Sequence, residues 1–116
     1  MATYLVLIYG DAQAWDGWSE EQERINVAAH AAFHAEYGKA IRGAAEVQRS
    51  AGVTGIRPDP AGRPTPSEGP LHPMSEALGG YYLLEAADDG EALAMAAHLP
   101  EAGDPISDVE VHRLAE

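Results

Sequence analysis

The chain has 116 residues, 46% of them hydrophobic, and no cysteine; seven Lys and Arg stand against nineteen Asp and Glu, for a formal net charge of −12. This length is typical of one domain, so we expect residues 1–116 to form a single domain. The lack of cysteine excludes disulfides, thiolate metal sites and a cysteine nucleophile. Because nucleic acids and anionic membranes are bound through Lys and Arg, we expect neither as a partner.

The N-terminal segment MATYLVLIYGD has neither a basic leader nor a small-residue cleavage site, so we interpret it as a strand rather than a signal peptide. No apolar run approaches the roughly 20 residues that a membrane-spanning helix needs. We therefore expect a cytoplasmic protein.

Two stretches predict central strands. Thr3–Tyr9 and Tyr81–Ala86 are rich in aliphatic and aromatic residues on both alternating faces. Between them, Ser19 with Gln22 three residues later is typical of a helix N-terminus, and a helix over residues 20–42 follows. The helical spacing predicts that one stripe of this helix packs on the sheet: Ile25, Ala29, Ala32, Phe33 and Ala40.

The remaining segments have weaker patterns. We predict a strand near residues 45–48, with a continuation at 53–56 and a short edge strand at 63–65 left open. Proline and glycine predict turns over 58–66 and a loop over 67–75. Asp88 or Asp89 is expected to cap a helix that Pro100 ends, and residues 108–114 alternate as a closing strand.

This order of elements predicts an α+β fold, namely a ferredoxin-like βαββαβ antiparallel sheet with two helices on one face. Two helices cover only one face of four strands, yet the two central strands are apolar on both. A monomer would expose a large apolar surface, which soluble proteins rarely do. We therefore predict a homodimer in which the two sheets pack face to face.

The segment from Ser67 to Pro100 resembles the YCII-related, DGPF-type proteins. Glu68–Leu71 (EGPL) stands where that family has Asp-Gly-Pro-Phe, and Leu78–Tyr82 (LGGYY) follows at the expected distance. The opening YLVLIYGDAQAW is also similar to the start of the family. The resemblance implies a dimeric α+β barrel with a pocket in each subunit, close to the histidine of the first helix and the Gly-Pro loop. It also implies a suspected enzyme, while some relatives accompany alternative sigma factors.

His30 occupies the position of the family histidine, three residues before Phe33, and is our candidate catalytic residue. Imidazole titrates near neutral pH and so suits a general acid or base; the alternative is a helix histidine at a subunit interface. The family's acidic partner has no clear match, and Glu36 and Glu46 are the nearest substitutes. His30 and His34 share a helix face that could bind a metal, but no third ligand is indicated. We expect no metal and no cofactor.

We predict that a ligand contacts the loop residues Glu68, Gly69 and Pro70, with the glycine allowing close backbone approach. Tyr9 and Tyr81 lie on central strands and are also predicted to contact the ligand. In each case packing is the alternative. Gly79-Gly80 precedes a strand rather than a helix, so we interpret it as a bulge and not as a phosphate loop.

The leading hypothesis is a homodimer that binds an unknown small organic molecule, with His30 transferring protons in an elimination, isomerisation or hydrolysis. The main alternative is a non-catalytic binding or regulatory module that acts through protein contacts, linked to sigma-factor-dependent transcription. A third hypothesis, a cofactor-free enzyme that uses oxygen, depends on fold analogy alone.

Overall fold

The computed structural model describes residues 1–47, 52–72 and 78–116. A four-stranded sheet is built from β1 (Ala2–Gly10), β2 (Ile41–Glu46), β5 (Leu78–Ala86) and β6 (Ser107–Arg113). The helical elements are α1 (Ala12–Asp16), α2 (Glu20–Tyr37), α3 (Asp89–Ala96) and a 3-10 turn, η3 (Pro100–Ala102). A separate hairpin pairs β3 (Thr54–Pro58) with β4 (Pro64–Glu68).

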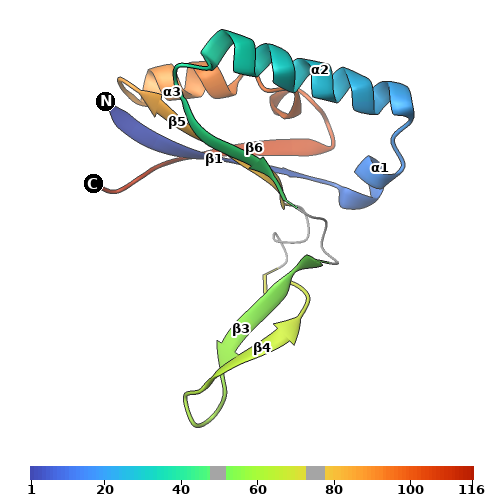
Figure 1. The fold of residues 1–116 in the computed structure, drawn as a ribbon, viewed down its shortest axis with the longest axis vertical. Helices are drawn as coiled ribbons and strands as arrows, with labels where there is room; N and C mark the ends of the chain where they lie inside the picture. Colours follow the sequence, from blue (N-terminus) through green and yellow to red (C-terminus); the bar gives the residue numbers. More distant parts are fainter. Residues whose placement is uncertain (48–51, 73–77) are drawn as a thin grey trace.

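The strand order of the main sheet is β2-β5-β1-β6, and each pair is antiparallel. This is the order of a ferredoxin-like fold when the hairpin is set aside, so the predicted α+β βαββαβ arrangement is confirmed. Figure 1 shows α2 and α3 on the same side of the sheet, as predicted. None of the described helices is long and apolar enough to cross a membrane.

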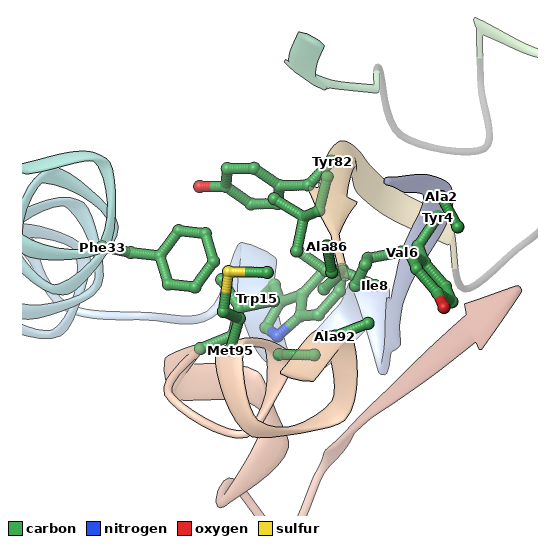
Figure 2. Packing of buried hydrophobic residues seen from close by; sticks show 13 residues of the cluster. Ala2, Tyr4, Val6, Ile8, Trp15, Phe33, Tyr82, Ala86, Ala92 and Met95 are labelled. Carbon is green, nitrogen blue, oxygen red and sulfur yellow. The ribbon is translucent and has the colours of Figure 1, made fainter. Parts of the chain in front are cut away.

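The core lies between the sheet and these helices. Alternate residues of β1 and β5 are buried there, as are small and apolar residues of α3, and Figure 2 shows Tyr82 and Phe33 approaching each other across this space. The opposite side chains of β1, from Thr3 to Tyr9, remain half-buried, and the described helices leave their face of the sheet open. The alternation of strand side chains therefore produces one covered and one open apolar face.

Helix α2 begins as predicted. Ser19 accepts a hydrogen bond from the Gln22 backbone, and the Gln22 side chain accepts one from the Ser19 backbone, which completes a capping box. The predicted C-terminus was wrong, because the helix ends at Tyr37 and residue 42 already lies in β2. Gly38 is the C-cap, which agrees with the weak helix propensity of glycine.

The predicted buried stripe of α2 was partly wrong. Ile25 is 63% exposed and Ala32 is also exposed, whereas Phe33 is buried as expected. The half-buried residues Asn26 and His30 instead share the sheet-facing side with Phe33. The apolar pattern favours the wrong side, because the sheet-facing side of α2 carries the polar residues Asn26 and His30, which bind groups on other elements.

The β3–β4 hairpin projects away from the main sheet in Figure 1. Its strands confirm the two that the sequence left open, near residues 53–56 and 63–65, and β4 extends to Glu68, into the predicted loop. Between them lies the predicted turn, whose tip is held by Asp59, which accepts hydrogen bonds from the backbone of Ala61 and Arg63. Gly62 and Gly69 have positive φ, the conformation that favours glycine. Part of the predicted strand at 45–48 and of the loop at 67–75 lies outside the described residues.

The Trp15 ring fills the space in which Gly10 and Gly79 would otherwise carry a side chain. Residues 12–16 form the short helix α1, capped by Asp11, and this helix directs the buried Trp15 ring onto Gly10 and Gly79. A Cβ on Gly79 would lie 2.6 Å from Cζ3 of the ring. The register of β1 and β5 also shifts here, so the predicted bulge at Gly79-Gly80 is confirmed.

Candidate functional site

A cavity of about 350 Å³ lies between α2 and one end of the sheet. Its wall combines residues of α1, α2, β1, β2, β5 and η3, so six separate elements of the chain converge on it. The aromatic part of the wall is formed by Trp15, Trp18, Tyr81 and Tyr82. Its ionisable part is formed by His30, His34, Glu23, Glu46 and Glu101.

His30 is held by a partner at each ring nitrogen. Nε2 lies 2.8 Å from Oε2 of Glu101, and Nδ1 lies 2.7 Å from the Tyr82 hydroxyl oxygen. Asn26, one helical turn earlier on α2, donates a hydrogen bond of 2.9 Å to the same Glu101 oxygen. Tyr82 and Glu101 fix the imidazole plane, Asn26 helps to hold Glu101, and the result is a His–Glu pair in the cavity wall.

Glu101 is a buried carboxylate whose side chain is 7% exposed. Burial by itself raises its pKa, but the hydrogen bonds from His30 and Asn26 and the charge of His30 outweigh that effect and lower the pKa overall. Glu101 is therefore ionised at neutral pH. Its other oxygen, Oε1, has no hydrogen-bond partner among the described residues.

Tyr82 is almost fully buried, and three rings surround it. His30 stacks parallel to it at 5.8 Å, Phe33 meets it edge-on at 5.0 Å and His34 lies at 5.4 Å. Burial and then the negative charge of Glu101 raise the pKa of Tyr82 to about 12. The phenol consequently remains protonated across the physiological range, with its hydroxyl directed at His30.

The predicted site residues do not all meet. His30 and Tyr81 line the cavity. Tyr9 does not line it; this residue sits beside Leu78 and Asp108 in the sheet register, and burial followed by the charge of Glu110 raises its pKa.

The loop residues predicted to contact the ligand lie elsewhere. Glu68 ends β4, and Gly69 and Pro70 follow it, so all three belong to the hairpin and none lines this cavity. A role for them and for Tyr9 in ligand binding stays a prediction.

The acid that pairs with His30 is Glu101, which sequence reasoning missed. Of the two substitutes considered, Glu46 lines the cavity without contacting His30, and Glu36 is exposed. Glu101 is 71 residues from His30 in the chain, and only Pro100, at the start of η3, marks its position in the sequence. The sequence predicts for Pro100 only the end of a helix, and that helix, α3, already ends at Ala96.

The cavity wall favours some ligands over others. Lys and Arg are absent from its lining among the described residues, whereas three glutamates are present. The described part of the chain also contains no group of three or more His, Asp or Glu arranged to hold a metal ion. The lining is suited to uncharged molecules with an aromatic or otherwise planar surface.

Comparison with known proteins places this geometry in context. The YCII-related domain model matches residues 2–115. An uncharacterised protein of Rhizobium meliloti (strain 1021) is 35% identical over 115 residues, which cover 97% of this chain and 91% of that protein.

Among solved structures, the 5-chloro-2-hydroxyhydroquinone dehydrochlorinase of Burkholderia phenoliruptrix, in complex with 2,5-dihydroxybenzoquinone, matches with a TM-score of 0.58. The match covers 98% of this chain and 94% of the dehydrochlorinase at 16% identity. At that identity the likeness shows the fold.

Proposed function

The chain belongs to the YCII-related family, and on that premise we propose that it is a cytoplasmic, homodimeric enzyme that performs acid–base chemistry on a small hydroxylated ring compound. The observation that carries this proposal is the His30–Glu101 pair in the wall of the cavity. A carboxylate that accepts a hydrogen bond from one imidazole nitrogen fixes the tautomer and orientation of the ring, so that the other nitrogen can serve in proton transfer.

The burial of Glu101 supports a functional role for the pair. Replacing a buried ion pair by apolar residues is often neutral or stabilising, so such a pair is weak as a device for stability. Here the carboxylate is desolvated with one oxygen unpaired, yet it is placed 2.8 Å from the histidine. A buried carboxylate that keeps one oxygen unpaired beside a histidine in a cavity wall is well explained by proton transfer.

The cavity supports the substrate class. Its volume of about 350 Å³ suits a molecule of one or two rings, since ligand sites usually measure about 300–1,000 Å³. Glutamates in the wall disfavour anionic ligands, and the Trp and Tyr rings offer surfaces for stacking. The structurally similar dehydrochlorinase acts, by its name, on a chlorinated hydroxyhydroquinone, a ring compound of this kind.

The direct test is turnover of 5-chloro-2-hydroxyhydroquinone, measured without oxygen and corrected for the rate without protein. Elimination of HCl would take a proton from the substrate, while chloride leaves with the electrons of the C–Cl bond, so chloride release is the readout. His30→Gln should lower the rate by about 10²–10⁴-fold, the usual contribution of a general acid or base. His98→Gln, outside the cavity lining, is the matched control. Equal rates for the wild type and His30→Gln would refute the role of His30.

The homodimer is supported by the open face of the sheet. At about 3.3 Å per residue and 4.8 Å between strands, the strands of 9, 6, 9 and 7 residues present a face of about 500 Å². Two copies face to face would bury about 1,000 Å², close to the minimum expected of a biological interface. Leu5, Leu7 and Leu83 lie in the central strands and supply the apolar part of this face.

Oligomeric state tests this part of the proposal. Light scattering after size exclusion should give a dimer for the wild type at micromolar concentration and a monomer for Leu83→Glu, because a buried unpaired charge costs several kcal/mol. Leu93→Glu is the control, since Leu93 is 56% exposed on α3, across the sheet from the open face. A monomeric wild type would refute the dimer.

A further inference from the structure

We infer that Tyr82, rather than His30, is the residue that contacts the substrate, and that its hydroxyl relays the proton between the substrate and the His30–Glu101 pair. The inference rests on the proposed function and assigns the contact within the same cavity. It follows from the fact that both nitrogens of His30 are already bound by residues of this chain, at 2.7 and 2.8 Å. No ring nitrogen is left to contact a ligand directly.

The direction of each hydrogen bond follows from Glu101. An ionised carboxylate only accepts hydrogen bonds, so Nε2 of His30 must carry the hydrogen that it shares with Glu101. In the neutral imidazole, Nδ1 is then the acceptor, and the Tyr82 hydroxyl must donate to it. The Tyr82 oxygen keeps lone pairs that can accept a hydrogen bond from a ligand hydroxyl.

The Tyr82 side chain is positioned for this contact. It lines the same cavity as His30, and its ring is fixed by the stacked His30 and by the edge of Phe33. Figure 2 shows the ring extending from the sheet above Phe33. Fixed rings at well-defined distances limit the motion of the hydroxyl, and such preorganisation is what proton transfer within a site requires.

The relay moves two protons, and both are accounted for by the substrate, Tyr82 and His30. As the substrate hydroxyl gives its proton to the Tyr82 oxygen, the original Tyr82 proton passes to Nδ1 of His30. The products are a substrate anion, a neutral Tyr82 and an imidazolium paired with the Glu101 carboxylate. In the return step, the imidazolium donates to the Tyr82 oxygen, and the Tyr82 hydroxyl proton goes to the substrate or to a departing group.

The high pKa of the Tyr82 phenol is consistent with transient proton transfer through the hydroxyl, and not with a phenolate that acts as the base in the resting protein. Burial and the charge of Glu101 raise this pKa to about 12, so a free phenolate does not accumulate at neutral pH. The residue stays neutral before and after the transfer, and the charge that develops resides on His30, beside Glu101.

The test uses the full chain with ¹⁵N-labelled histidine and hydroquinone as the probe, followed by NMR of the imidazole nitrogens. In the unmutated protein, His30 should be the Nε2–H tautomer, and adding hydroquinone should shift its Nδ1 resonance. Tyr82→Phe should abolish that shift and weaken binding of the probe about tenfold or more. Tyr4→Phe is the matched control: it removes a tyrosine hydroxyl bound to Asp89, outside this cavity, and should change neither.

The outcomes separate the two proposals. An Nδ1–H tautomer in the unmutated protein, which requires no variant to fold, overturns the relay. An Nδ1 shift of equal size in Tyr82→Phe also overturns the relay, because His30 then contacts the ligand directly, and the proposed function stands. If hydroquinone and its hydroxylated analogues leave every cavity resonance of the wild type unchanged, the proposed function and the relay both fail.

Discussion

Gly79→Ala should perturb one wall of the cavity through a single contact. The added Cβ would lie 2.6 Å from Cζ3 and 2.7 Å from Cη2 of Trp15, whereas carbon atoms in contact are about 3.5–4.0 Å apart. The indole must therefore move by about 1 Å. Gly79 does not have a positive φ, so the backbone itself tolerates alanine and the cost is one of space. Overpacking of this kind destabilises a protein by about 1–3 kcal/mol.

Urea unfolding, followed by far-UV circular dichroism, measures that cost. Gly43→Ala is the matched control, because a Cβ there would meet Leu83 at an ordinary 3.5 Å, and it should be neutral or mildly stabilising. A double-mutant cycle with Trp15→Leu isolates the contact, since leucine lacks the outer ring atoms that clash. In that background the cost of Gly79→Ala should fall close to zero.

An equal cost of Gly79→Ala in both backgrounds would refute the clash with Trp15, because the glycine would then be needed for a backbone reason and not for the indole ring. Trp15 lines the cavity, so the same variant should weaken binding of a ring compound by displacing that wall. Gly43→Ala, outside the cavity lining, should bind as the wild type does.

Three further predictions concern stability. Ser19→Ala removes one half of the capping box and should cost about 1 kcal/mol in urea unfolding, with no loss for Ser67→Ala on the exposed hairpin. Because the pKa of Glu101 is lowered in the folded protein, its ionised carboxylate contributes full stability above pH 4.5, the usual pKa of glutamate, and this contribution is lost as the pH falls further. Glu101→Gln should therefore flatten the acid limb of a plot of unfolding free energy against pH. The raised pKa of Tyr82 has the opposite sign, with its stability complete below pH 10 and lost as the pH rises through about 12, so Tyr82→Phe should flatten the alkaline limb. An unchanged acid limb in Glu101→Gln, or an unchanged alkaline limb in Tyr82→Phe, would contradict the pKa shift assigned to that residue.

The elements that the sequence predicted well are those encoded by neighbouring residues. The capping box at Ser19, the Asp88 cap of α3 and the alternation of β1 and β5 all involve residues within a few positions of one another, and each is present in the structure. The sheet order also followed, because few topologies satisfy two central apolar strands with two helices. His30 was found as a candidate through resemblance to a family whose membership is now shown.

Only the tertiary structure decided what surrounds His30. Tyr82 is 52 residues away and Glu101 is 71 residues away, and neither separation carries a periodic signal. The same is true of Trp15, whose ring reaches across two strands to explain Gly10 and Gly79. Helical periodicity reported which residues of α2 share a side, but not which side meets the sheet, because Asn26 and His30 become buried by bonding to groups that distant segments supply. Polar burial depends on partners, and partners at long range are set by the fold.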